Sequence, residues 1–240
     1  DHEIALWLNQ MAGQRPALDR FVYTLSASAL LKGGLFMAFF WWQWFRHDAA
    51  RTARRQLILT ALAGAIVAIA AARALQIALP FRVRPLHDAA LSLRPPAGVN
   101  PATLDGWSSL PSDHAVLFFA LATAVWRLSR PLGGGAFLWA GVVVCLPRVY
   151  LGYHHATDIL AGALLGVLVM TLSLALLRPR LLAGPLLRWE RAHATSFYCL
   201  AFLASLQLAV MFQDVRALAG DTIGLVELLR EPTAQTADAP

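Results

Sequence analysis

The sequence predicts an all-α membrane protein, a bundle of six transmembrane helices. Of its 240 residues, 58% are hydrophobic and only 14% are charged, whereas a soluble domain of this size has about 25% charged residues. Apolar stretches of roughly 20 residues, long enough at 1.5 Å per residue to cross the hydrocarbon core of a bilayer, recur along the chain. Arginine-rich segments separate these stretches, which is the distribution that topology signals have in membrane proteins.

Six apolar segments are expected to span the membrane. In chain order they cover residues 26–45, 56–80, 112–126, 136–153, 156–177 and 195–215. The first ends in a cluster of tryptophans, which suits the interfacial belt. The third has Ser112 as a plausible N-cap, and the glycine run at 133–135 is placed in the loop before the fourth. The fifth carries Gly162-x-x-x-Gly166, a spacing that permits close contact between helices.

The remaining segments are polar. Residues 1–20 suit a short amphipathic helix lying in the membrane interface, or an ordinary polar leader. Residues 81–111 contain five prolines and are predicted to form a loop. Residues 178–194 are predicted to be a basic loop. The expected organisation is one membrane-embedded domain over residues 1–216, followed by a polar tail at 217–240.

The distribution of arginine predicts which loops lie inside the cell. The formal net charge of +6 raises the question of nucleic-acid binding, but the arginines lie between apolar segments, so the expected partner is the lipid bilayer and no nucleic acid. The loops at 46–55, 127–132 and 178–194 carry four, two and four arginines, whereas those at 81–111 and 153–156 carry three and none. By the positive-inside rule the first set is cytoplasmic and the second faces outward.

Three polar motifs lie at the outward ends of the predicted spans. They are Arg82-Val83-Arg84-Pro85, Pro111-Ser112-Asp113-His114 and Arg148-x5-His154-x3-Asp158. A carboxylate four residues after a histidine shares its helical face and can orient the ring, leaving the other ring nitrogen free as a nucleophile. The planar fork of an arginine suits a phosphate-like anion. The motifs therefore predict a site for a phosphorylated substrate on the outward side.

In this order, the motifs resemble the three signature motifs of the type 2 phosphatidic acid phosphatase (PAP2) family, over roughly residues 77–158. The Pro-Ser-Asp-His variant most resembles the bacterial undecaprenyl pyrophosphate phosphatases. The resemblance implies an enzyme of cell envelope biogenesis in the bacterial inner membrane, with its active site facing the periplasm or exterior. It would hydrolyse undecaprenyl pyrophosphate to undecaprenyl phosphate and need neither cofactor nor metal.

The resemblance also implies a role for each motif residue. His154 would be the nucleophile that forms a phosphohistidine, Asp158 would orient it, and His114 would protonate the leaving group. The residues implied or expected to line the phosphate site are Arg84, Arg148, Ser112, Arg82 and Asp113.

The sequence departs from the family pattern at three positions. The family has a lysine seven residues before the arginine of the first Arg-Pro, and this chain has Ile77 there. Arg73 or Arg82 could supply the missing charge, and we expect Arg82 because it lies nearer the mouth of the site. Pro147 stands where the third motif usually has a serine. Asp113 would repel a phosphate unless it pairs with an arginine or is protonated.

Several alternatives remain open from the sequence. His155 could meet Asp158 at i,i+3 and act in place of His154, and these three residues could form a zinc site. His87 and Asp88 are expected to be solvated or to face the substrate. The substrate could instead be phosphatidate, phosphatidylglycerophosphate or a lipid A phosphate, or the chain could be a transporter that binds an anionic lipid without turnover. The sequence does not specify an oligomeric state.

Overall fold

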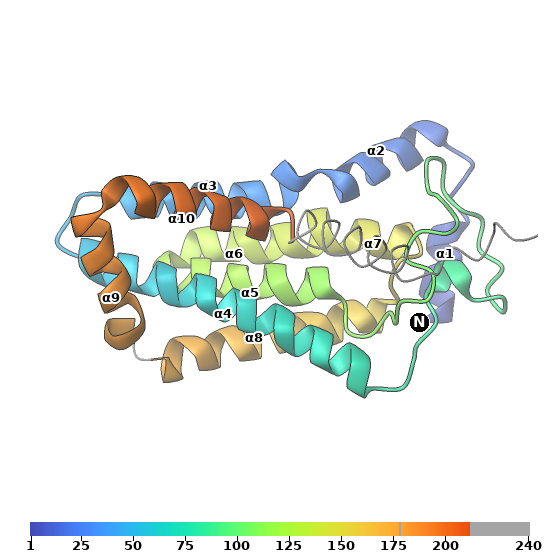
Figure 1. Cartoon of the computed structure of the whole chain (residues 1–240). Helices are drawn as coiled ribbons and strands as arrows, with labels where there is room; N and C mark the ends of the chain where they lie inside the picture. Colours follow the sequence, from blue (N-terminus) through green and yellow to red (C-terminus); the bar gives the residue numbers. More distant parts are fainter. Residues whose placement is uncertain (178, 212–240) are drawn as a thin grey trace, which may run out of the picture.

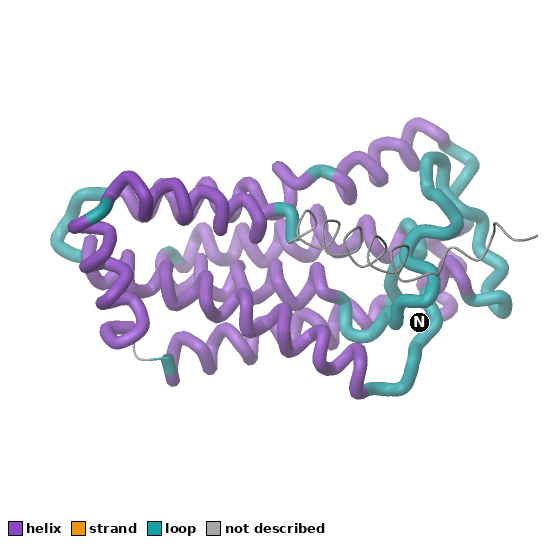
Figure 2. The backbone as a smooth tube through the Cα atoms, viewed as in Figure 1, coloured by secondary structure: helices purple, strands orange, loops and turns teal. Residues whose placement is uncertain are grey.

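Helices make up nearly all of the regular structure in the computed structural model of the chain, which describes residues 1–177 and 179–211. These residues contain no strand, so the predicted all-α class is confirmed. The longest helices lie side by side along one axis, α9 lies at one end of the bundle, and most of the irregular chain gathers at the other (Figures 1 and 2). The predicted tail at 217–240 and the end of the sixth predicted span lie outside the described residues.

The bounds of the helices follow the apolar segments of the sequence. In chain order they are α1 (His2–Asn9), α2 (Pro16–Ala27), the π-helix η1 (Leu30–Gly34), α3 (Leu35–Phe45), α4 (Arg51–Ala78), the 3-10 helix η2 (Pro85–His87), α5 (Asp113–Leu128), α6 (Arg130–Trp139), the π-helix η3 (Ala140–Cys145), α7 (Leu146–Tyr150), α8 (Ala156–Leu176), α9 (Pro179–Ala192) and α10 (Ala194–Ala209).

Three helical stretches in the described part of the chain are long and apolar enough to cross a membrane: Arg51–Ala78, Arg130–Tyr150 and Ala156–Leu176. A fourth crossing results if α2 and the following η1–α3 helix, which meet at an angle of 54°, count as one broken span. The helices α5 and α10 are apolar but have 16 residues each, so each is about 24 Å long against a hydrocarbon core of about 30 Å.

The first predicted span is not continuous, contrary to expectation. Ser28 ends α2 in an extended conformation, with φ −64° and ψ 109°. Its hydroxyl accepts a hydrogen bond from the N–H of Leu31 at 3.2 Å. A serine side chain that binds a nearby backbone N–H competes with the helical ladder, and here it begins a new helix instead of continuing the old one.

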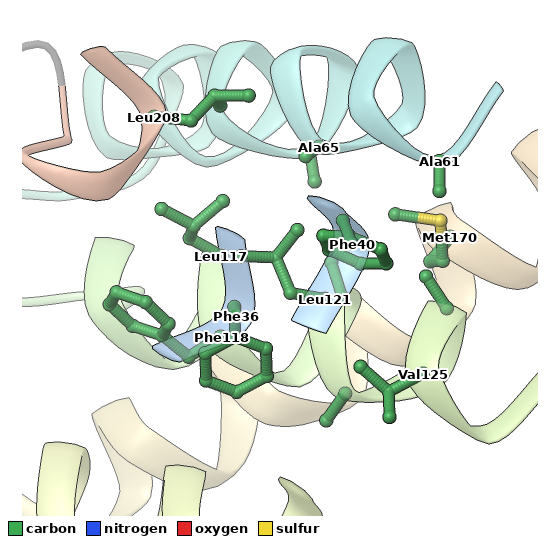
Figure 3. Close-up of a cluster of buried hydrophobic side chains, with 14 of the residues drawn as sticks. Phe36, Phe40, Ala61, Ala65, Leu117, Phe118, Leu121, Val125, Met170 and Leu208 are labelled. Atoms are coloured by element: carbon green, nitrogen blue, oxygen red, sulfur yellow. The ribbon is translucent and has the colours of Figure 1, made fainter. Parts of the chain in front are cut away.

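The helix α5 forms the centre of the bundle. Almost all of its side chains from Ala115 to Val125 are buried, and the helix packs against α4, α6 and α8. Its apolar residues share one cluster with Phe36 of α3 and Leu208 of α10 (Figure 3). On α8, a Cβ atom added to Gly166 would lie 2.2 Å from the carbonyl oxygen of Val116, and one added to Gly162 would lie 2.7 Å from that of Ser112. The predicted small-residue contact is therefore confirmed, and its partner is α5.

The glycine run at 133–135 is helical, whereas the sequence placed it in a loop. It lies in the first half of α6, which begins directly after Ser129 ends α5. A Cβ atom at Gly133 would lie 2.3 Å from the Cα of Trp126. Glycine is therefore required here by the tight α5–α6 hairpin, and not by a flexible turn.

The predicted basic loop at 178–194 is also a helix over most of its length. Helix α9 covers Pro179–Ala192 in spite of Pro185 in its interior. Its apolar residues Ala183 and Leu187 are buried, while Arg188 and Arg191 alternate with them along the sequence. The helix is amphipathic, and it packs on α4 and α10. Its arginines belong to the polar side of this helix, although in the sequence they suggested a loop.

Candidate active site

The loop between α4 and α5 brings the first motif to the third. The N–H of Leu86 donates to the carbonyl of Gly152 at 2.9 Å, and the N–H of Ser109 donates to the carbonyl of Arg82, also at 2.9 Å. Both ends of the loop are thus tied down, one to the α7–α8 turn and the other to the loop's own first residues. The predicted loop at 81–111 is confirmed, and it closes over the end of the bundle.

A tight turn at the end of α7 sets the spacing of the third motif. Gly152 has φ +72°, a left-handed conformation that glycine adopts without strain. The N–H of Tyr153 donates to the carbonyl of Arg148 at 2.9 Å and that of Gly152 to the carbonyl of Val149 at 3.1 Å. These two bonds form a Schellman motif. The chain therefore reverses between Arg148 and His154, and the five intervening residues bring both side chains to one region.

The ring of His154 is fixed at both nitrogens. Its Nδ1 lies 2.9 Å from the carbonyl oxygen of Ser109, and its Nε2 lies 3.3 Å from Nη1 of Arg84. A carbonyl oxygen only accepts hydrogen bonds, so the proton must sit on Nδ1. The lone pair of Nε2 then points at a guanidinium group, where an anion would bind. The side chain is 4% exposed.

Backbone carbonyls hold the guanidinium of Arg84. It donates to Trp107 at 3.0 Å, to Tyr153 at 2.6 Å and to Ser108 at 3.0 Å. Burial lowers the pKa of Arg84 to about 10, an effect that the charges of Asp113 and Asp158 oppose. The group therefore stays cationic at neutral pH.

His155 faces a different way from its neighbour. Its Nε2 lies 3.2 Å from the carbonyl oxygen of Val83, and its ring stacks on His2 with 5.9 Å between the ring centroids. Its backbone N–H donates to Oδ2 of Asp158 at 2.7 Å, at the start of α8. The ring of His155 thus contacts the loop and α1.

Asp158 lies between His154 and Arg82. Its Oδ2 is 3.8 Å from Nδ1 of His154, which is longer than a hydrogen bond. Its Oδ1 is 2.6 Å from Nη1 of Arg82. Arg82 also contacts the hydroxyl of Thr157 at 2.9 Å and the carboxylate of Asp1 at 2.8 Å. The guanidinium group of Arg82 is therefore paired with carboxylates of the protein itself.

The residue that contacts Nδ1 of His154 most closely is thus Ser109, which sequence analysis did not find. Ser109 makes this contact with its backbone carbonyl. Every residue type has that group, so the sequence cannot reveal the contact. Asp158 was expected from its spacing, and it lies in the predicted place but at the longer distance.

Arg148 and His114 form a second pair in the site. Nη2 of Arg148 hydrogen-bonds to Nε2 of His114, and its guanidinium lies 5.4 Å from the centre of the Tyr153 ring. Nε of Arg148 and the hydroxyl of Ser112 are buried and have no hydrogen-bond partner among the described residues. Ser112 occupies the N-cap position of α5 as predicted, but its side chain makes no capping bond.

Asp113 is paired with Arg73. Nη2 of Arg73 lies 2.6 Å from Oδ2 of Asp113, and Gln76 donates to Oδ1 of the same carboxylate at 2.8 Å. The guanidinium of Arg73 also lies 5.1 Å from the centre of the Trp107 ring. Ile77, at the position of the family lysine, is 85% exposed on the outside of the bundle. The carboxylate of Asp113 is thus neutralised by an arginine.

The surroundings favour the neutral form of His154. Burial lowers its pKa below the ordinary value of 6.5, and the positive charges of Arg84 and Arg148 act in the same direction, against Asp158. A neutral imidazole with a free Nε2 is the nucleophilic form. Burial also lowers the pKa of His155.

The other titratable residues of the loop have structural contacts. Nε2 of His87 lies 3.0 Å from the carbonyl oxygen of Thr103, and Asp88 accepts a hydrogen bond from the N–H of Ala90 at 3.0 Å. Within residues 1–177 and 179–211, no group of three or more His, Cys, Asp or Glu side chains forms an arrangement that could hold a metal ion.

Comparison with known proteins agrees with this geometry. The model of the PAP2 superfamily matches residues 81–181, which contain all three motifs. The bacitracin transport permease protein BcrC of Bacillus licheniformis and the putative undecaprenyl-diphosphatase YbjG of Escherichia coli are each 38% identical, over 63 and 60 residues. The lipid A 1-diphosphate synthase of Escherichia coli is 26% identical over 166 residues.

These matches differ in extent. The first two relatives match over 25% of this chain and 30% of their own length. The third matches over 68% of this chain and 65% of its own length. No solved structure matches.

Proposed function

We propose that the chain, whose residues 81–181 match the PAP2 superfamily, is a membrane phosphatase acting on a lipid-linked phosphate or diphosphate. The observation that carries the proposal is the environment of His154, whose Nδ1 lies 2.9 Å from a carbonyl and whose Nε2 lies 3.3 Å from the guanidinium of Arg84. A free imidazole lone pair beside a fixed cation is what attack on a bound phosphoryl group requires.

In the first step, Nε2 of His154 attacks the terminal phosphorus. The bond between this phosphorus and the bridging oxygen breaks, and the protonated ring of His114, an imidazolium, passes one proton to the departing lipid phosphate and becomes neutral. Arg84 and Arg148 lie against His154 and His114 respectively, so a phosphoryl oxygen held by either arginine is within reach of a histidine. Their charges stabilise the equatorial oxygens of the transition state.

In the second step, water attacks the phosphohistidine. His114 now accepts a proton from this water, the P–N bond breaks, and inorganic phosphate leaves. Neither step requires a metal, because arginine and the buried hydroxyl of Ser112 supply the electrostatic and hydrogen-bonding contacts. The loss of a serine at Pro147 is compensated by these unpartnered donors, which include Nε of Arg148.

We further propose that Arg73, and not Arg82, supplies the charge of the missing family lysine. The charge of Arg73 acts on Arg84, together with those of Asp113 and Asp158, so Arg73 belongs to the electrostatic surroundings of the phosphate site. Arg73 pairs with one carboxylate, that of Asp113, whereas Arg82 is shared between two carboxylates, those of Asp158 and Asp1. Sequence analysis preferred Arg82 for its position near the mouth, and the contacts favour the opposite assignment.

The proposed topology has six crossings, with α5 and α10 added to the three long helices and the broken α2–α3 span. The catalytic loops then lie on the outer side of the bacterial inner membrane, because the arginine-rich segments at 46–55 and 188–191 gather at the other end (Figure 1). Undecaprenyl pyrophosphate is the leading substrate, since a relative that is 38% identical over 60 residues is named a putative undecaprenyl-diphosphatase.

A second candidate function is transfer of the phosphoryl group to another lipid. The relative that matches the greatest share of this chain among the three is named lipid A 1-diphosphate synthase. The same phosphohistidine would then be attacked by a phosphate oxygen of a lipid acceptor instead of by water, and the product would be a lipid diphosphate.

The test is phosphate release by the purified protein from a panel of polyprenyl diphosphates, phosphatidate, phosphatidylglycerophosphate and lipid A. Release from a polyprenyl diphosphate, unaffected by EDTA and inhibited by vanadate, supports the proposal. Release that EDTA abolishes and zinc or magnesium restores contradicts the metal-free mechanism. Formation of a lipid diphosphate without free phosphate supports the transferase, and binding without any turnover supports a transporter.

A further inference from the structure

An apolar groove lies between α3, α4, α9 and α10. Helices α9 and α10 lie toward the end of the bundle away from the proposed catalytic loops (Figure 1). The volume of the groove is about 350 Å³. Its walls include Phe40, Leu62, Trp189 and Ala201, and it is open at a rim where Ile66 and Leu200 are each more than half exposed. No residue of the proposed catalytic site contributes to it.

The polar atoms on the walls of this groove are already bonded within the protein. Nε1 of Trp41 donates to the hydroxyl of Ser205 at 3.2 Å, and that hydroxyl donates to the carbonyl of Phe202 at 2.8 Å. Nε1 of Trp44 donates to the hydroxyl of Tyr198 at 3.1 Å. These walls therefore present hydrocarbon to an occupant, and the matching occupant in a bilayer is an alkyl chain.

A buried arginine lies behind one wall of the groove. The guanidinium of Arg55 is stacked 4.6 Å from the centre of the Trp44 ring, which lines the groove. The side chain of Arg55 is 7% exposed, and its Nη1 pairs with Glu190 at 3.0 Å. Its Nη2 is buried without a hydrogen-bond partner in the described part of the chain. One donor of this cation is therefore unpaired behind the Trp44 wall of the groove.

Positive charge is in excess around Arg55. The segments at 46–55 and 188–191 carry six arginines but only two acidic residues, Asp48 and Glu190. Basic pockets between membrane helices attract the phosphate groups of anionic lipids. The apolar groove and the arginines near it together therefore match a molecule with one long alkyl chain beside a negatively charged headgroup.

We propose that this groove binds an anionic glycerophospholipid of the bilayer, with one acyl chain between α3, α4 and α10 and the phosphate at Arg55 and the arginines around it. This second lipid site is independent of the proposed catalytic function, because it shares no residue with it. The lipid would hold α9 and α10 against α4.

The groove is tested by thermal unfolding of the purified full-length protein in detergent with added phosphatidylglycerol or phosphatidylcholine. Phosphatidylglycerol should raise the apparent Tm of the wild-type protein more than phosphatidylcholine does. Ala63→Phe, which fills the groove from α4, should lose this increase. Ala70→Phe, on an exposed part of the same helix that does not line the groove, should keep it.

The charge requirement is tested by lipid retention in native mass spectrometry. Arg55→Gln should lower the ratio of retained phosphatidylglycerol to phosphatidylcholine by about fivefold, the effect of one basic residue near an anionic surface, whereas Arg94→Gln in the opposite loop should not. An unchanged Tm increase in Ala63→Phe would overturn the proposal. So would equal retention of both lipids by the wild-type protein, or a dimer that Ala63→Phe dissociates with no lipid bound.

Discussion

His154 and His155 are adjacent in sequence, and their backbone-carbonyl contacts distinguish them chemically. The carbonyl of Ser109 lies at Nδ1 of His154, whereas the carbonyl of Val83 lies at Nε2 of His155. The protons therefore sit on different nitrogens, and only His154 directs a lone pair at a guanidinium. The family spacing selected the same residue from the sequence. The reason for the selection, a carbonyl on a loop 45 residues earlier, was accessible only from the fold.

The pH dependence of the reaction should reflect the burial of His154. Its folded-state pKa lies below the ordinary 6.5, so the nucleophile is lost only as the pH falls through that lower value. We expect kcat/KM to stay near its plateau at pH 6.5, with the acid limb below it. An acid limb centred at or above pH 6.5 would contradict this assignment. The His155→Ala variant serves as the control and should keep the same profile.

The same shift predicts the direction in which pH affects stability. Between the lowered pKa of folded His154 and the ordinary 6.5, the unfolded chain binds more protons at this histidine than the folded chain does, so the free energy of unfolding falls as the pH decreases through this range. His155 acts in the same direction.

Loss of the Arg73–Asp113 ion pair should weaken substrate binding. Arg73→Ala leaves the carboxylate of Asp113 unpaired beside an anionic substrate, so kcat/KM should fall at least about tenfold, chiefly through KM. Replacing Asp113 by glycine, the family residue, in the same chain should restore part of the loss. Arg82→Ala should instead lower kcat, because Arg82 contacts Asp158 and not the phosphate site.

Steady-state kinetics at matched concentrations of folded protein measure this difference, with Arg94→Ala as a control in the same loop. The assignment of Arg73 fails if Arg73→Ala leaves KM unchanged while Arg82→Ala raises it.

The length of the apolar segments predicted the long helices correctly, and the Gly162-x-x-x-Gly166 spacing predicted a close helix contact correctly. The second and fifth predicted spans correspond to α4 and α8 within a few residues. The sequence did not predict the break at Ser28, because the break depends on a single hydrogen bond from the N–H of Leu31 to the Ser28 hydroxyl. Helix α9 was missed because four arginines and Pro185 in the segment suggested a loop, although its apolar residues have helical spacing. Packing of these apolar residues on α4 stabilises α9 as a helix.

The contact between α5 and α8 should tolerate no added methyl group. A Cβ at Gly166 would lie 2.2 Å from the carbonyl oxygen of Val116, so the two helices must separate. We expect Gly166→Ala to destabilise the protein by about 1–3 kcal/mol, as overpacked cores do.

Gly135→Ala is the matched control, because a Cβ there has no neighbour within 4 Å. Reversible unfolding in a mixed-micelle system measures both variants. Equal stability of the two would show that the α5–α8 contact is not as close as the structure has it.

The molecule as a whole has two chemically different ends. One carries the catalytic loops around His154, and the other carries α9 and the arginines of the segment at 46–55 (Figure 1). The three motifs lie at one end, and the arginines that the positive-inside rule predicts to be cytoplasmic lie at the other. The number of crossings was harder to predict, because α5 and α10 are shorter than a bilayer core and depend on their neighbours for burial.

Cysteine labelling tests the orientation. In a background without the native cysteines, Asn100→Cys in the catalytic loop should react with a membrane-impermeant maleimide in intact cells. His47→Cys, at the arginine-rich end, should react only after the membrane is permeabilised. The reverse pattern would place the active site in the cytoplasm.

The most direct measurement is to trap the phosphorylated enzyme. The protein is mixed briefly with a polyprenyl diphosphate that is radiolabelled in its terminal phosphate, and the reaction is quenched in alkali, which preserves phosphohistidine. The account predicts an acid-labile label in the wild-type protein and in His155→Ala, and none in His154→Ala. A label that persists in His154→Ala, or wild-type turnover with no labelled protein at any time, would contradict it.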